Sequence, residues 1–319
     1  MDINYEVMDK VELKSCRHKA EKRWYRRMVV LNLLIIVGII VYVISTAKAN
    51  GAYFQRLQKE FIAANHEIMQ KVETDAPAKK TEVAMDTFSA TLEKFPDSIM
   101  YLGFIIFMII ALPFIVSYMY AQYRSMSVKI TEKNFPEIYA IVDEYAARLG
   151  LKKVPKVYLI QGNGILNAFA AFIPFRQYIE LYADLIEVAY REHHDMETLR
   201  FLIGHEMAHI RLGHATLHYA LAMLFSNMIP ILSSTASRTR EYSCDRIGQK
   251  LSGSDGIEAM MVLTAGIHLY KQVDIEDYIE NAKMVKGVFV WSYNLVADHP
   301  ITSKRVLALA MKDGSGKLY

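Results

Sequence analysis

Residues 196–213 read METLRFLIGHEMAHIRLG, which places His205, Glu206 and His209 on one predicted helix. Side chains four positions apart on a helix share a face, so the two histidines point the same way. Two imidazoles at this spacing can bind one Zn²⁺ at about 2.0–2.1 Å each. Glu206 lies beside them, where it can take a proton from a zinc-bound water. The stretch predicts a metal site with a general base; the alternative is a helix whose histidines only form hydrogen bonds.

A catalytic zinc needs a third protein ligand and one open position. Residues 237–245 read SRTREYSCD, and Glu241 and Asp245 lie four apart on the predicted helix that contains them. Glu241 is the candidate third ligand. Asp245 can accept a hydrogen bond from the nitrogen of a zinc histidine that does not bind the metal. The alternative for this stretch is a solvated, charged helix face.

Around these helices the apolar pattern predicts a domain in which strands come first and helices follow. This order is typical of an α+β domain. The last two strands are joined across residues 173–176, as in a hairpin. The expected strands are 155–161, 165–172 and 177–182, and the expected helices are 135–149, 183–190, 196–213, 216–233, 236–252, 255–269 and 301–311.

Two uncharged apolar stretches, 28–45 and 99–121, come before this domain. A helix of about 20 apolar residues crosses the hydrocarbon core of a bilayer, so both qualify as spans. A pair of buried core helices is the alternative for both stretches. A cleaved signal peptide is an alternative for the first, but its apolar run is longer than usual and a long segment precedes it, which favours an uncleaved anchor.

Lys and Arg are concentrated before the first apolar stretch and after the second. The positive-inside rule therefore predicts that both termini are cytoplasmic. The expected order is a cytoplasmic segment (1–27), a span (28–45), an extracytoplasmic helical segment (46–98), a span (99–121) and a cytoplasmic catalytic domain (122–319). The extracytoplasmic segment is expected to be interrupted near Asp75-Ala76-Pro77.

Composition excludes some classes of protein and partner. Apolar residues make up 53% of the 319 residues and charged residues 22%, which favours a membrane anchor joined to a globular domain. The net charge of +3 is too small to indicate a nucleic-acid partner. The two cysteines form no spacing typical of a disulfide scaffold.

Four stretches together resemble a known family. His205-Glu-Met-Ala-His209-Ile-Arg-Leu-Gly-His214, followed by Glu241-Tyr-Ser-Cys-Asp245, is similar to the M48 family of membrane-associated zinc metallopeptidases. That family includes the HtpX-type bacterial proteases and the CAAX proteases. Two more stretches agree with it, Asn167-Ala168-Phe169-Ala170 and His299-Pro-Ile-Thr-Ser-Lys-Arg305. The resemblance covers about 165–310.

The resemblance implies a mainly helical zincin of the gluzincin type, with a small β-sheet, behind two transmembrane helices. It implies one zinc per subunit and a location in a bacterial inner or plasma membrane. The implied roles are zinc ligands (His205, His209, Glu241), catalytic residues (Glu206, His299), residues that support the site (Asp245, Arg305) and a substrate-binding edge strand (Asn167, Ala168, Phe169). For His299 the alternative is a turn residue ahead of the last helix. His214 is expected to be structural, and Cys244 a small buried residue.

The chain departs from HtpX-type proteases, which carry two spans between the histidine helix and the glutamate. Only 31 residues separate His209 from Glu241 here. If the apolar run 216–233 crossed the bilayer once, Glu241 would lie across the membrane from His209, and two crossings need about 40 residues. We therefore expect this run to pack in the domain or to lie against the membrane surface. The lack of a chamber of many spans argues against CAAX processing.

These features predict a membrane-anchored zinc endopeptidase that cleaves membrane or misfolded proteins, as in quality control. Its expected partners are protein or peptide substrates and the lipid bilayer, with no nucleic acid. The alternative is a catalytically silent adaptor or chaperone-like module that keeps the peptidase fold.

Overall fold

The structure is a computed structural model that describes residues 5–71, 96–192, 194–311 and 316–319. It divides into two compact units. One unit consists of residues 33–112, and the other joins residues 1–32 to residues 113–319. The interruption expected near Asp75-Ala76-Pro77 lies outside the described residues.

In its described residues, the unit of residues 33–112 contains most of α2 (Glu21–Ser45), α3 (Ala47–Lys71) and the first half of α5 (Asp97–Ser125). Near the start of α3, Thr46 Oγ1 donates to Ser98 Oγ at 2.9 Å, joining it to α5. Both α2 and α5 are long and apolar enough to cross a membrane, and they contain the predicted spans 28–45 and 99–121. The chain thus carries the apolar helices expected of a membrane protein.

The larger unit contains a four-stranded sheet with the order β1-β2-β4-β3. Its strands are β1 (Ser127–Lys129), β2 (Lys156–Ile160), β3 (Ala168–Ile173) and β4 (Arg176–Tyr182). β3 and β4 form the expected antiparallel hairpin, whereas β2 pairs with β4 in parallel. β3 therefore lies at one edge of the sheet, with one side of its backbone unpaired by other strands.

Helix α8 (Met196–Leu212) lies between two apolar clusters, and eleven of its residues are buried. Ile203 and Met207 face a cluster that includes the sheet and α6 (Pro136–Arg148). Phe201 and Leu202 face a second cluster with α11 (Ile257–Ala265) and α14 (Thr302–Ala310). A helix buried on both sides in this way is held rigidly, which suits it to carry a site.

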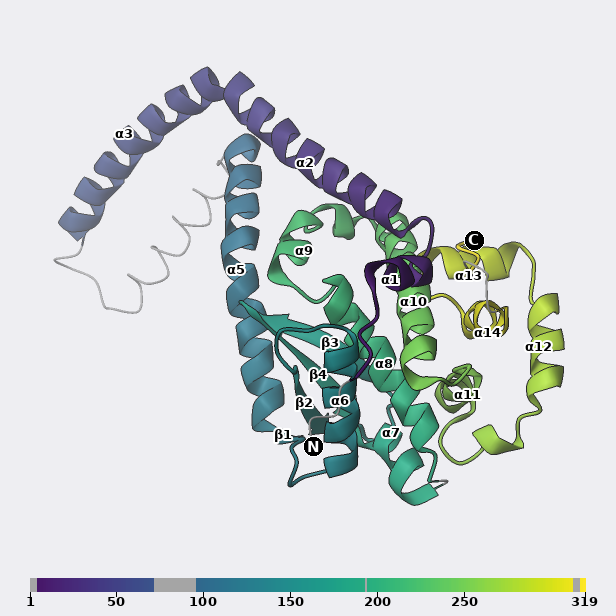
Figure 1. The fold of residues 1–319 in the computed structure, drawn as a ribbon. Helices are drawn as coiled ribbons and strands as arrows, with labels where there is room; N and C mark the ends of the chain where they lie inside the picture. The colour runs from purple at the N-terminus through teal and green to yellow at the C-terminus, as the bar shows by residue number, and fades with distance from the viewer. Residues whose placement is uncertain (1–4, 72–95, 193, 312–315) are drawn as a thin grey trace. The chain divides into compact units, whose positions relative to one another are not determined.

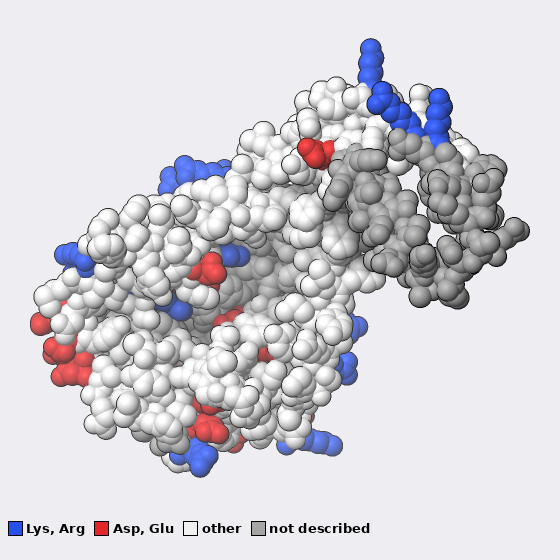
Figure 2. All heavy atoms as spheres, turned by 180° about the vertical axis from the view of Figure 1, so that it is seen from behind, with Lys and Arg blue, Asp and Glu red and all other residues white. Residues whose placement is uncertain are grey.

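Figure 2 shows a face of the molecule that is hollowed near its middle, with charged side chains around the hollow as well as at the margins. The remaining elements surround α8 and the sheet. They are α1 (Lys10–Cys16), α7 (Ala183–Glu187), a π-helical turn η1 (Val188–Glu192), α9 (Leu217–Ala222), η2 (Ser226–Met228), α10 (Pro230–Ser252), η3 (Tyr270–Gln272), α12 (Ile275–Met284) and α13 (Val288–Val296). The sequence predicted neither β1, α1, α12 nor α13.

The stretch 216–233 differs from the single helix that was expected. It contains α9, the short turn η2 and, from Pro230, the start of α10. The break is held by Asn32 of α2, whose side chain donates to Leu221 O at 3.3 Å and accepts from Phe225 N at 2.8 Å. None of the described helices in this stretch is a candidate span, so it packs in the domain against α2.

The segment 1–27, which the sequence predicts to be cytoplasmic, contributes residues to the larger unit. Helix α1 begins after Asp9, whose carboxylate accepts from two backbone amides of its first turn. Met8, Leu13 and Cys16 belong to the main apolar cluster of the larger unit. Part of the described chain before the first apolar run therefore contributes to the domain core.

Helices α8 and α10 cross at a pair of glycines. A Cβ added to Gly204 would lie 3.2 Å from Gly248 Cα, and one added to Gly248 would lie 3.2 Å from Phe201 O and 3.3 Å from His205 N. These neighbours are backbone atoms, which cannot rotate away. Glycine at both positions therefore lets the two helix backbones approach closely.

We expect Gly248→Ala to lower the thermal midpoint of unfolding. Overpacking costs about 1–3 kcal/mol, which opposes a gain of about 1 kcal/mol from the better helix propensity of alanine. Gly51→Ala in α3 is the matched control, because a Cβ there meets nothing within 4 Å. Thermal unfolding followed by circular dichroism measures both, and a Gly248→Ala protein that melts at or above the wild-type temperature would contradict the close crossing.

Candidate metal centre

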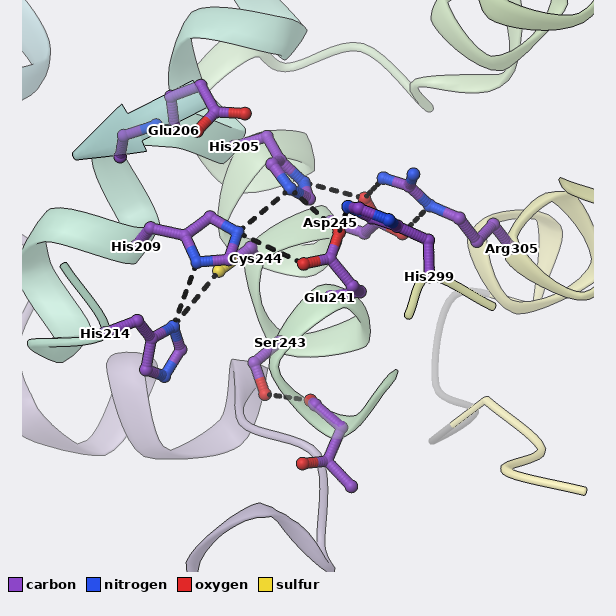
Figure 3. A network of polar contacts seen from close by, with 12 residues as sticks. His205, Glu206, His209, His214, Glu241, Ser243, Cys244, Asp245, His299 and Arg305 are labelled. Carbon is purple, nitrogen blue, oxygen red and sulfur yellow. Dashed lines mark hydrogen bonds and ion pairs between the residues drawn. The ribbon is translucent and has the colours of Figure 1, made fainter. Parts of the chain in front are cut away.

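Three side chains from α8 and α10 converge on one point (Figure 3). His205 Nε2 and His209 Nε2 lie 3.2 Å apart. Glu241 reaches both rings, with Oε2 at 3.3 Å from His205 Nε2 and Oε1 at 3.4 Å from His209 Nε2. The structure therefore brings together the three residues that the sequence predicted as metal ligands.

The spacing of these donor atoms fits a divalent metal. Nitrogen and oxygen ligands at 2.0–2.1 Å in a tetrahedral zinc site lie about 3.3 Å from one another. Glu241 is buried, and its Oε2 has no hydrogen-bond partner among the described residues. A buried carboxylate oxygen without a partner is costly, and a metal ion would remove that cost. The two rings and the carboxylate thus form a candidate metal group.

The back of His205 is held by a buried ion pair. Asp245 Oδ1 lies 2.8 Å from His205 Nδ1. Arg305 of α14 donates to both oxygens of the same carboxylate, at 2.9 and 2.5 Å. Burial opposes the charged carboxylate, but Arg305 and His205 outweigh it and keep the pKa of Asp245 below its usual value. Asp245 can therefore accept a hydrogen bond from His205 Nδ1–H, which leaves His205 Nε2 free for a metal.

Glu206 lies next to His205 on α8, beside the edge strand (Figure 3). Its Oε2 accepts a hydrogen bond from Ala170 N of β3 at 2.6 Å. Burial raises the pKa of Glu206 to about 7 in the metal-free protein, although His205 opposes this effect. The carboxylate thus lies between the histidine helix and the edge strand, with a raised proton affinity.

His299 lies where the group opens to solvent. It follows α13, and 66% of its side chain is exposed. Its Nε2 is 3.6 Å from Glu241 Oε2. This position allows the imidazole to contact a group bound beside Glu241.

The predicted substrate-binding residues lie at the start of β3. Asn167 comes just before the strand, and its backbone oxygen accepts from Tyr182 N at 3.1 Å, which continues the pairing with β4. Ala168 begins the strand. The Phe169 ring packs edge-on against Tyr123 and Tyr182. These contacts fix the edge strand beside Glu206.

His214 lies against the back of His209, and three further residues are linked to it by polar contacts. Sequence reasoning gave none of the four a role at the metal. His214 Nδ1 is 3.2 Å from His209 Nδ1, and Cys244 Sγ is 3.8 Å from His214 Nδ1. Burial lowers the pKa of His214 to about 4, although Glu21 opposes the shift. The carboxylate of Glu21 contacts His214 Nε2, and the Ser243 hydroxyl donates to that carboxylate. The spacing of His214 after His209 was a usable signal, whereas nothing links Glu21 to the site in the sequence.

We expect Asp245→Ala to lower the free energy of unfolding by about 3–5 kcal/mol, because Arg305 would keep a buried charge without its partner. Adding Arg305→Met to Asp245→Ala removes that charge and should restore part of the loss. Chemical unfolding of the metal-free proteins measures both variants. An Asp245→Ala protein of wild-type stability, or a double variant less stable than the single one, would contradict the buried pair.

Comparisons of sequence relate part of this chain to known peptidases. Residues 132–231 match the family model "Peptidase family M48", which covers the two histidines and ends before Glu241. The chain is 24% identical over 242 residues to a "Protease HtpX homolog" of Pyrobaculum aerophilum, covering 63% of this chain and 66% of the relative. It is 26% identical over 210 residues to a "Protease HtpX homolog" of Pyrobaculum calidifontis, covering 53% and 58%.

The matched part thus spans less than two thirds of the length of either relative. The observed architecture, mainly helical with a small sheet, is consistent with a peptidase domain of this family. The family match and both relatives confirm the resemblance that the motifs predicted: by sequence, this chain is related to the M48 peptidases.

Proposed function

We propose that this chain is a membrane-anchored zinc endopeptidase that hydrolyses peptide bonds of protein substrates. One observation carries the proposal. His205 Nε2 and His209 Nε2 lie 3.2 Å apart, and the two oxygens of Glu241 lie 3.3 and 3.4 Å from these nitrogens, one oxygen to each. The carboxylate of Glu206 lies on the same helix as the two histidines. The relation to M48 peptidases supports it.

His205, His209 and Glu241 would hold one zinc per subunit and leave one coordination position open. When bound, the metal supplies a Lewis acid that polarises a carbonyl and lowers the pKa of a water. Glu206 would accept the proton of the attacking water and later pass it to the leaving amine. The hydrogen bond from Ala170 N holds this carboxylate in place beside the edge strand.

Strand β3 would bind the substrate. It pairs with β4 on one side only, so an extended peptide can add to its other side through main-chain hydrogen bonds. Asn167, Ala168 and Phe169 start this strand and would fix the peptide's register. His299, exposed beside Glu241, would stabilise negative charge that develops on the scissile carbonyl. Binding through the backbone favours protein substrates of varied sequence.

The placement in the membrane follows from the two apolar helices and the distribution of basic residues. Residues 28–45 and 99–121 would span the bilayer, with 46–98 outside and the segments 1–27 and 122–319 in the cytoplasm. A catalytic domain tethered in this way works close to the membrane. We therefore propose membrane or misfolded proteins as substrates, in a quality-control role at a bacterial inner or plasma membrane.

Glu206→Gln tests this function. We expect the purified full-length variant to keep one zinc per subunit and to lose about 10²–10⁴-fold in the rate of casein cleavage, because it lacks the general base. Glu197→Gln, an exposed glutamate in the first turn of the same helix, is the matched control and should cleave like the wild type. Chelation of the wild-type metal should abolish cleavage, and added zinc should restore it.

A wild-type protein without zinc and without cleavage would contradict the proposal and support a silent adaptor. Undiminished cleavage by Glu206→Gln would contradict the role of that carboxylate.

A further inference from the structure

Polar contacts on the Nδ1 side of the His209 ring connect it, through His214, to the buried carboxylate of Glu21. Its Nε2 faces His205 and Glu241, while its Nδ1 lies 3.2 Å from His214 Nδ1. On the far side of that ring, His214 Nε2 lies 3.2 Å from Glu21 Oε1. His214 and Glu21 are both buried, with 8% and 3% of their surfaces exposed. A continuous chain of polar contacts therefore runs from the candidate metal ligand to Glu21.

The chemistry of these groups fixes the direction of each hydrogen bond. A carboxylate only accepts, so His214 Nε2 must donate to Glu21. A neutral imidazole has one N–H, which leaves His214 Nδ1 as an acceptor. His209 Nδ1 must then donate to it, and the remaining His209 nitrogen, Nε2, keeps a free lone pair. That nitrogen is the one that faces Glu241.

Local structure holds each member of this chain in place. Helix α8 ends at Gly213, which has a φ of 80°, and the turn brings His214 back so that its amide donates to His209 O at 3.0 Å. A left-handed glycine is the usual way to end a helix with such a turn. Figure 3 shows the His214 ring lying against His209 as a result.

Hydrogen bonds also hold the Glu21 side chain in place. Ser243 of α10 and Arg17 both donate to its carboxylate. The Ser243 hydroxyl in turn accepts from His18 N at 2.9 Å, so both His18 and Glu21 are bound to α10 at Ser243. Residue 243 lies two positions from Glu241 on the same helix. The anchor and the ligand thus share one rigid element.

We infer that Glu21 and His214 are positioning residues for the metal centre, which hold His209 in the ring orientation and proton arrangement that zinc binding needs. This inference rests on the proposed function. His205 has a carboxylate, Asp245, directly behind it. His209 has an imidazole and then a carboxylate, supplied by a segment outside the catalytic motifs. Partners of this kind orient metal ligands and raise metal affinity.

The same contacts have one competing explanation. His209, His214 and Cys244 also form a group whose donor atoms lie within 4.8 Å of one another, which is compatible with a second metal. If both metals were bound together, His209 would have to give up its Nδ1 proton and bridge them. The hydrogen-bond chain needs no such loss, because each proton in it has one donor and one acceptor.

The test is a double-mutant cycle in zinc affinity, measured on full-length, metal-stripped protein in detergent by competition with a chromophoric zinc chelator. We expect His214→Ala and Glu21→Ala each to weaken zinc binding by about 10–100-fold. The double variant should be little weaker than His214→Ala alone, because both residues act through one chain. His214→Gln, whose amide oxygen can still accept from His209, should recover part of the loss.

Two controls separate positioning from folding and from a second metal. Thermal unfolding of the metal-free proteins shows whether each variant folds; should His214→Ala not fold, His214→Gln and Glu21→Gln carry the test, with smaller losses expected. Cys244→Ala removes a neighbour of His214 that lies outside the chain, and it should bind one zinc within about twofold of the wild-type affinity, since it leaves every donor and acceptor of the chain in place.

Folded His214→Ala and Glu21→Ala variants with wild-type zinc affinity would overturn this inference and leave the proposed function standing. Independent, additive losses, or a second zinc that Cys244→Ala removes, would overturn it as well. A wild-type protein that binds no zinc would overturn both.

Discussion

The close approach of α8 and α10 is the constraint on which the site depends. At Gly204 and Gly248 the two backbones meet without side chains between them. His205 and His209 extend from one helix, and Glu241 and Asp245 lie on the other, about two turns and about one turn before Gly248 respectively. Wider spacing would separate the carboxylate from both imidazoles. A pair of glycines that take no part in the chemistry therefore sets the helix spacing at which the three side chains can bind a metal.

The cost of burying charge explains the rest of the arrangement. Asp245 and Arg305 neutralise each other behind His205, and Glu21 is held by an arginine, a serine and a histidine behind His209. Glu241 differs from these two carboxylates, because one of its buried oxygens has no hydrogen-bond partner among the described residues, as is also true of Glu180 and Asp184 outside the site. Buried carboxylates of this kind persist where they bind something positive. The carboxylate of Glu241 lies beside His205 and His209, where a bound cation would satisfy its unpartnered oxygen.

Sequence predicted the parts of this structure that follow from local pattern. The helix of residues 196–213, the β3–β4 hairpin and both apolar helices were recognisable from periodicity, and the donor set followed from spacing and family resemblance. Features that depend on contacts between distant parts of the sequence were not recognisable in this way. Glu21 and His214 are 193 positions apart, and only tertiary packing joins them. The break after α9 depends on hydrogen bonds to Asn32, which the pattern of residues 216–233 does not reveal. Helices α12 and α13 lie in a stretch where no strong periodicity was recognised.

X-ray absorption at the zinc edge, on the purified full-length protein, tests the central claim most directly. The account predicts a single zinc surrounded only by nitrogen and oxygen at about 2.0–2.1 Å, with the outer-shell scattering of two imidazole rings. A sulfur ligand at about 2.3 Å would place the metal on Cys244 rather than on Glu241 and would contradict the account.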